Sequence, residues 1–152
     1  MTAPRPPACN VAYNDLASLA AIAAQGFDPW GQAVTVGEQI TTGFAHVTGA
    51  SAAADGTLTG FLILSLSPRL IPPADWTITG HSGALNLGCL TIRYPAPARV
   101  GAALQGRRKL LSAREHPRGT LLTLAFEVRE EGAQAPCLTA QSELLYLGGR
   151  AQ

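Results

Sequence analysis

Two histidines and one aspartate are the side chains through which this sequence could move protons. His46 stands near the end of a helix-like stretch, and His81 lies in the turn-like run Gly80-His81-Ser82-Gly83. Imidazole changes its charge near neutral pH, which suits it to general acid–base work. Asp55 could act as a base, or it could simply form an Asp-Gly turn with Gly56. We therefore take Asp55, His46 and His81 as candidate catalytic residues.

A second group of residues could hold a substrate instead. Thr57 and Thr59 precede a long apolar stretch, and either hydroxyl could hydrogen-bond to a substrate carbonyl or cap the coming helix. The run from Arg107 to Lys109 is the one basic cluster; it could meet a phosphate of coenzyme A or of a carrier protein, or form a solvated strand face. Cys89 is typical of a small core residue rather than of a nucleophile.

The composition excludes several functional classes. The chain has 152 residues, 47% hydrophobic and 14% charged, with a net charge of +1. A net charge so close to zero does not support general electrostatic binding of nucleic acid, and the high apolar content argues against disorder. The longest apolar run, Phe61 to Leu66, is far below the roughly 18 residues of a membrane span. So little charge indicates that part of the surface lies in a partner or in an apolar pocket.

The three cysteines, at positions 9, 89 and 137, form no CxxC motif and have no histidine at ligand spacing. This pattern predicts neither a disulfide framework nor a metal site, and nothing in it calls for a cofactor. Together with an N-terminus unlike a signal peptide, it predicts a cytoplasmic protein. We expect a flexible lead over residues 1–13, one domain over 14–148 and a tail over 149–152.

Helices are predicted before strands along the chain. Asn14 or Asp15 can cap a short helix, and the capping box Thr35-Val36-Gly37-Glu38 predicts another that ends at Gly49. The apolar stretch from Thr57, running up to two prolines, favours a third helix buried on all sides. Four strands then follow, over residues 85–94, 100–111, 120–129 and 138–147. This order predicts an α+β domain with an antiparallel sheet and a short extra N-terminal helix.

Three of these stretches resemble the MaoC-like hydratases, particularly their nodulation-protein-N-like branch: residues 60–66, 85–88 and 92–101, the last with its Pro-Ala-Pro block. Phe44-Ala45 with Thr48-Gly49 is similar to the first helix of that family. The resemblance implies a hot-dog fold, in which an antiparallel sheet wraps around one long helix, and a homodimer. It also implies hydration of enoyl thioesters or dehydration of 3-hydroxyacyl thioesters.

The resemblance breaks at the family's acid–base pair. There the first helix ends in Thr-Gly-Asp and a nearby His completes the pair, whereas here Ala50 follows Gly49 and a short loop replaces the rest. Gly60 matches the family's oxyanion donor, whose amide lies at a helix N-terminus that attracts negative charge. Asn86 matches an Asn of the family motif and could orient a ligand or satisfy backbone groups beside a bulge.

These departures leave three functions open. The first is a repurposed enzyme, a cyclase or dehydrative tailoring enzyme of natural-product biosynthesis, that acts on a hydrophobic acyl or polyketide-derived molecule by holding it in a reactive conformation. The second is a thioester hydratase or dehydratase with a substituted acid–base pair. The third is a non-catalytic chain that shapes the pocket of another hot-dog chain. In each case the expected ligand is a small molecule, carried by coenzyme A, by a carrier protein or by neither, and no nucleic acid or membrane is expected.

Overall fold

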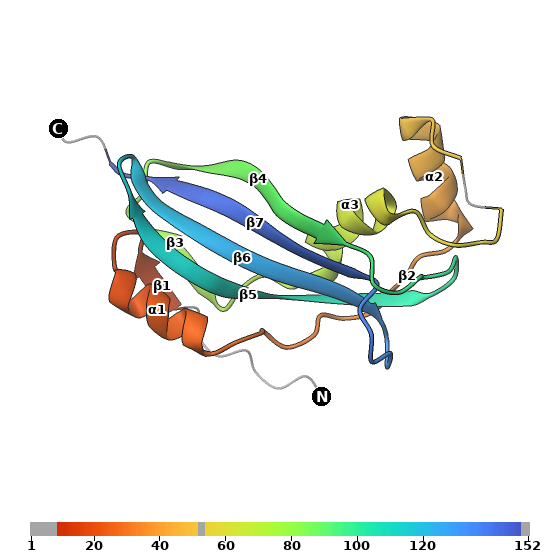
Figure 1. Ribbon diagram of the computed structural model, residues 1–152, viewed down its shortest axis with the longest axis horizontal. Coiled ribbons are helices and arrows are strands. Elements are labelled where there is room, and N and C mark those ends of the chain that lie inside the picture. Colours follow the sequence, from red (N-terminus) through yellow and green to blue (C-terminus); the bar gives the residue numbers. More distant parts are fainter. Residues whose placement is uncertain (1–8, 52–53, 150–152) are drawn as a thin grey trace.

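The fold is built on one antiparallel sheet whose inner face carries the helix α3 (Figure 1). The computed structural model describes residues 9–51 and 54–149. Five strands make the sheet, in the order β2-β5-β6-β7-β4. Their bounds are β2 (Val34–Thr35), β4 (Gly83–Arg93), β5 (Ala103–His116), β6 (Gly119–Glu130) and β7 (Leu138–Leu147). The expected α+β class and antiparallel sheet are confirmed.

Helix α3 (Gly60–Leu70) fills one half of the inner face. Leu62, Ile63 and Leu70 are buried against strand residues that include Leu104 and Val128. The helix is not buried on all sides as expected, because the side chain of Phe61 is 73% exposed and Ser65 is also exposed. The apolar pattern could not show this, because the pattern alone does not reveal how many sides of a helix the single chain covers.

The other half of the inner face is covered by the N-terminal region. Helix α1 (Leu16–Ala24) packs there with β1 (Cys9–Ala12) and β3 (Trp76–Thr79), which pair in parallel. Asp15 caps α1, as expected, since its Oδ1 accepts a hydrogen bond of 3.0 Å from Ser18 N. Residues 9–12, which the sequence placed in a flexible lead, therefore form a strand; residues 1–8 and 150–152 lie outside the described ranges.

Helix α2 (Glu38–Thr48) projects beyond the end of the sheet (Figure 1). The expected capping box is wrong: the N-cap is Gly37, and no side chain caps the helix. Thr35 is instead drawn into β2, where it pairs with Ala103. The expected end is confirmed, because Gly49 adopts the left-handed conformation with φ of 71°. No residue of α2 is buried, so this helix is held by partial contacts only.

The two edges of the sheet differ in how they are protected. Along β5, the backbone amides of Asp28 and Gly31 donate to Arg108 O and Gly106 O, each at 2.8 Å. The guanidinium groups of Arg107 and Arg129 both lie over the Trp30 ring, at 4.2 and 4.0 Å from its centroid. This segment closes the β5 edge. It also shows that two members of the basic cluster, Arg107 and Lys109, are stacked on aromatic rings rather than freely solvated.

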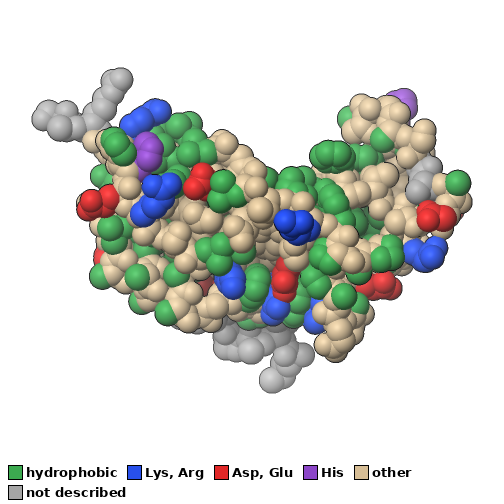
Figure 2. All heavy atoms as spheres, viewed as in Figure 1, with side chains coloured by type: hydrophobic (Ala, Val, Ile, Leu, Met, Phe, Trp, Pro, Cys, Tyr) green, Lys and Arg blue, Asp and Glu red, His purple; other side chains and the backbone are tan. Residues whose placement is uncertain are grey.

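The opposite edge strand, β4, is exposed along almost its whole length. Leu87 and Leu90 are 51% and 55% exposed, and Leu85 and Ile92 are also exposed. Figure 2 shows hydrophobic side chains along the upper rim of the sheet, over β4, and a hollowed surface between the sheet and α2. Within the described ranges, no helix is long and apolar enough to cross a membrane.

Candidate functional site

The start of α3 is held by a loop that follows β4. Leu58 N donates to Ala98 O at 2.7 Å, and Val100 N donates to Gly56 O at 2.9 Å. Thr57 forms a bridge with Arg99 on the same loop. These contacts place the first turn of α3 against the end of β4, although the two are far apart in the sequence.

Tyr94 lies directly on Gly60. A Cβ added to Gly60 would stand 2.6 and 2.7 Å from Cε1 and Cε2 of that ring, and the nearest atom of all is Cζ, which carries the hydroxyl. The phenol hydroxyl therefore lies beside the N-terminus of α3. Burial raises the pKa of Tyr94, so the phenol stays protonated at neutral pH and can donate a hydrogen bond.

A hollow of about 330 Å³ opens between these two residues and the following loop. We call it the Gly60 hollow, and its walls are largely apolar: Thr57, Leu58, Gly60, Phe61, Ile63, Tyr94, Ala96, Pro97, Ala98 and Cys137. Burial raises the pKa of the Cys137 thiol to about 11, which makes this cysteine a neutral wall residue rather than a nucleophile.

The hydroxyl of Thr59 is buried at the same helix start. Its Oγ1 has no hydrogen-bond partner among the described residues, and it does not cap α3. Thr59 also lines a hollow of about 20 Å³ between α2 and α3, where Phe44 and Leu62 form the apolar wall. A buried hydroxyl without a partner is costly, so this oxygen is suited to bond with something that enters the site.

Asp55 lies two residues before Thr57, in an exposed turn. Its Oδ1 accepts a hydrogen bond of 2.9 Å from Thr57 N, and Arg99 Nη1 donates to its backbone oxygen at 2.9 Å. The hydrogen bonds from Thr57 lower the pKa of Asp55. The carboxylate is therefore ionised at neutral pH, as a base must be, but it is a weak base in this geometry.

The two histidines are not brought together with Gly60. His46 is exposed in the last turn of α2 and lines neither hollow at the start of α3. His81 lies in the turn between β3 and β4, where its ring meets Tyr146 edge-on at 4.9 Å. Because β4 has 11 residues, about 36 Å of strand separates His81 from Tyr94 at 3.3 Å per residue.

Asn86 also lies away from the hollow, on the exposed strand β4. Its Oδ1 accepts a hydrogen bond of 3.0 Å from Gly88 N, at the register shift between these two residues. This is the bulge-supporting role that the sequence left open. Of the predicted binding residues, the structure thus brings Thr57, Thr59 and Gly60 together and leaves Asn86 apart.

The sequence reasoning missed Tyr94 as a site residue. Tyr94 stands inside the segment that carries the family resemblance, but nothing in its pattern shows that the ring crosses to α3.

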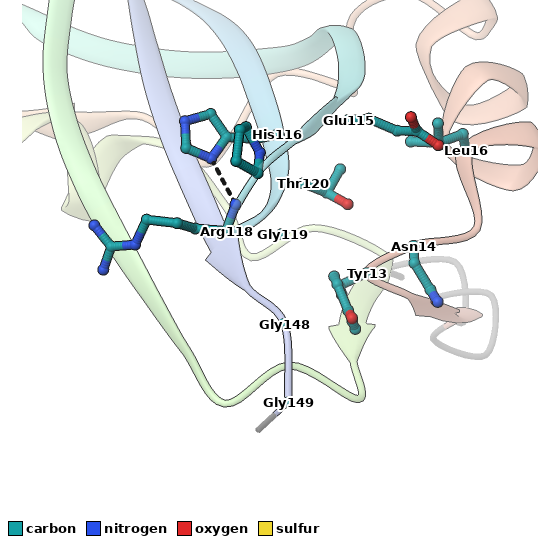
Figure 3. A pocket seen from close by; sticks show the side chains of 11 residues that line it. Tyr13, Asn14, Leu16, Glu115, His116, Arg118, Gly119, Thr120, Gly148 and Gly149 are labelled. Carbon is teal, nitrogen blue, oxygen red and sulfur yellow. Dashed lines mark hydrogen bonds between the residues drawn. The ribbon is translucent and has the colours of Figure 1, made fainter. Parts of the chain in front are cut away.

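A larger hollow, of about 670 Å³, lies at the other end of the sheet (Figure 3). It is open, its lining is about equally polar and apolar, and Figure 3 shows the Arg118 side chain directed away from Tyr13 and Asn14. In the part of the chain that the structure describes, no three His, Cys, Asp or Glu side chains gather as metal ligands would.

Comparison with known proteins gives a relative over nearly the full length. The chain is 30% identical over 151 residues to 3-hydroxyacyl-thioester dehydratase Z of Mycobacterium tuberculosis, covering 89% of this chain and 97% of that protein. The Mycobacterium bovis protein of the same name matches equally well. No family model matches the chain.

Solved structures share the fold at low sequence identity. A chain of the ChsH1–ChsH2 complex from Mycobacterium tuberculosis superposes with a TM-score of 0.71 at 12% identity, over 90% of this chain and 97% of that one. The MaoC-like dehydratase from Rhodospirillum rubrum gives 0.60 at 12% identity, over 80% and 91%. The (R)-hydratase from A. caviae involved in PHA biosynthesis gives 0.56 at 17% identity, over 78% and 94%. With a 30% identical relative along almost the whole chain and a sheet wrapped on α3, this protein belongs to the MaoC-like dehydratase and hydratase family of hot-dog proteins.

Proposed function

We propose that this chain is a thioester hydratase or dehydratase with a substituted acid–base group, binding its acyl thioester at the start of α3. The observation that carries the proposal is the unpartnered, buried Thr59 hydroxyl at the start of α3, where its chain neighbours Leu58 and Gly60 line an apolar hollow of about 330 Å³. The relationship to 3-hydroxyacyl-thioester dehydratase Z supports thioester chemistry. It favours this function over the cyclase or tailoring function that the sequence alone ranked first.

The helix start supplies the electrostatic part of such a reaction. Adding water to an enoyl thioester, or removing it from a 3-hydroxyacyl thioester, develops negative charge on the thioester carbonyl oxygen. We place that oxygen beside the Gly60 amide, at a helix N-terminus, and the Tyr94 hydroxyl; the Thr59 hydroxyl lies at the same helix start. The apolar wall beside them would lower the local dielectric constant and strengthen these hydrogen bonds.

Proton transfer is the part that the described side chains support least. Asp55 is the carboxylate nearest in sequence to Thr57 and Gly60, and its lowered pKa keeps it ionised. We assign the base to Asp55, because its carboxylate is hydrogen-bonded to Thr57, a residue that lines both hollows at the helix start. His46 and Asp55 themselves line neither hollow, and His81 lies near the far end of β4. An exposed, weak base predicts slow hydration.

The test follows crotonyl-CoA hydration by the loss of its enoyl absorbance. Wild-type protein should consume the substrate, and Asp55→Asn should slow it about 10²–10⁴-fold while preserving the turn, since an Asn oxygen can accept the same bond from Thr57. Asp15→Asn is the matched control, an exposed cap with the same local hydrogen bond, far from the site. An unchanged rate in Asp55→Asn would refute the role of Asp55 as the base. If the wild-type protein did not hydrate crotonyl-CoA, the proposed hydratase activity itself would be refuted.

A second function is favoured by the exposed β4 edge. A long apolar edge strand without Lys or Pro is a template for pairing with another chain, and Arg93 is the one charged residue on β4. If the partner is a chain of the same fold that carries the proton-transfer groups, this chain would shape the pocket and bind the thioester without turning it over. Binding of saturated acyl-CoA with no hydration by the chain alone would support this function over the first.

We further propose that a second copy of the chain pairs with β4. Antiparallel pairing centred on Gly88 would set Arg93 opposite Gly83 and Leu87 opposite Cys89, so no like charges would meet. The double substitution Leu87→Lys with Leu90→Lys should convert a dimer to a monomer in light scattering. Val47→Lys, on α2 where Val47 is 83% exposed, should leave the dimer intact. A monomeric wild-type protein, or a dimeric double variant, would refute this pairing.

A further inference from the structure

A second apolar hollow lies on the inner face, near the other end of α3. We call it the Arg108 hollow; its volume is about 330 Å³ and its walls are Ser67, Pro68, Ile71, Pro73, Arg108, Leu124, Phe126 and Ser142. Arg108 is the single charged side chain in this wall. It projects from β5 onto the inner face, because its cross-strand partner is Phe126 and it alternates with Arg107 and Lys109 on the outer face.

The two hollows lie on the same side of α3. The Gly60 hollow contacts Gly60 and Ile63 of the helix, and the Arg108 hollow contacts Ser67 and Ile71 just beyond it. These positions follow the spacing of three and four residues that lines up one helix face. At 1.5 Å per residue, Ser67 lies about 10 Å and Ile71 about 16 Å along the axis from Gly60. An extended acyl chain that starts at Gly60 would therefore run toward Arg108.

The guanidinium of Arg108 is only partly satisfied. Nη2 donates to Pro72 O, and Nε lies 3.4 Å from Asp28 Oδ2 without hydrogen-bond alignment. Its side chain is 25% exposed. The ion pair with Asp28 offsets the cost of a positive charge among apolar walls. Arginine carries five N–H donors, however, and the contacts with Pro72 and Asp28 use only part of them. Arg108 therefore has donors left for an anionic group that enters the hollow.

We propose that the two hollows take one substrate, an acyl thioester whose chain ends in a carboxylate, with that carboxylate bound by Arg108. This inference rests on the proposed function, which places the thioester at Gly60. A purely structural Arg108, tying Pro72 and the segment around Asp28 to the sheet, would show no preference among acyl chains. The two roles therefore differ in ligand selectivity.

The experiment compares saturated acyl-CoA ligands, which cannot be hydrated, by titration calorimetry. Plain octanoyl- and decanoyl-CoA are matched with ω-carboxyl forms of the same lengths. Wild-type protein should bind at least one ω-carboxyl ligand about tenfold or more tightly than its plain counterpart, as expected for a charge-assisted hydrogen bond. Arg108→Met should abolish this preference and leave the affinity for plain ligands unchanged.

Two further variants separate the ligand role from the structural one. Asp28→Asn removes the competing carboxylate and should increase the preference for ω-carboxyl ligands. Lys109→Met removes the same charge from the outer face, where Lys109 Nζ lies 4.6 Å from the Phe27 centroid, and should change nothing. Plain ligands that bind with no ω-carboxyl preference would overturn this inference alone, as would a preference that survives in folded Arg108→Met. No binding of any acyl-CoA would overturn the proposed function and this inference with it.

Discussion

Replacing Gly60 by alanine tests the contact on which the site is built. The new Cβ would lie 2.6–2.7 Å from two atoms of the Tyr94 ring, well inside van der Waals contact, so the ring must move. Overpacking of this kind costs about 1–3 kcal/mol, against a gain of up to about 1 kcal/mol from replacing glycine in a helix. We expect a net loss of about 1–2 kcal/mol in the free energy of unfolding, measured by urea denaturation.

A double-mutant cycle with Tyr94→Ala isolates that contact. Once the ring is gone, Gly60→Ala should be neutral or stabilising, which gives a coupling energy of about 1–3 kcal/mol. Gly43→Ala is the matched control, because Gly43 lies inside α2 and a Cβ there meets no atom within 4 Å. It should stabilise by about 0.5–1 kcal/mol in either background. If Gly60→Ala behaved like Gly43→Ala with Tyr94 present, the stacking of Tyr94 on Gly60 would be wrong.

Two other predictions concern buried polar groups. Thr59→Val should leave the free protein as stable or up to about 1 kcal/mol more stable, because the hydroxyl has no partner to lose. The same substitution should weaken the affinity for acyl-CoA in calorimetry. A loss of stability would show that Thr59 does cap α3. Cys137 should resist a thiol reagent at pH 8 that labels the exposed Cys9 and Cys89. Burial raises its pKa to about 11, above the value near 9 of the unfolded chain. Its contribution to the free energy of unfolding is therefore complete below pH 9 and is lost as the pH rises toward 11. Urea titrations between these pH values should show a decline that Cys137→Ala removes, and equal labelling of three thiols in the folded protein would contradict its burial.

Much of the fold was predictable because its signals are local. Alternation at Leu122, Leu124 and Val128 marked β6, and Gly49 marked the end of α2. The strands β1 and β2 were not predicted, since Cys9–Ala12 and Val34–Thr35 are too short for periodicity and are fixed by distant partners. The capping box failed for the same reason, because Thr35 pairs with Ala103 in the sheet and α2 begins only at Glu38, with Gly37 as its N-cap.

The site was only half predictable. Thr57, Thr59 and Gly60 are consecutive or nearly so; the two threonines were indicated by their place before the apolar stretch, and Gly60 by the resemblance. Tyr94 and Arg108 reach the site or its neighbourhood through the packing of strands on α3, and no spacing in the sequence encodes that contact. His81 illustrates the converse error: a suitable residue type in a suitable turn, placed by the length of β4 near the opposite end of the sheet from Gly60.

The unprotected β4 edge lies close to both hollows. The chain closes the β5 edge with its own segment and with the rings of Phe27 and Trp30, yet it leaves β4 bare. Cys89 of β4 pairs with Ser142 of β7, and Ser142 lines the Arg108 hollow. Tyr94, which follows β4 directly, lines the Gly60 hollow and is 44% exposed. A chain that paired with β4 would therefore lie close to both hollows, and it would remove apolar surface and bound ligand from water at once. Ligand binding and assembly would then be thermodynamically linked, each strengthening the other by the same factor.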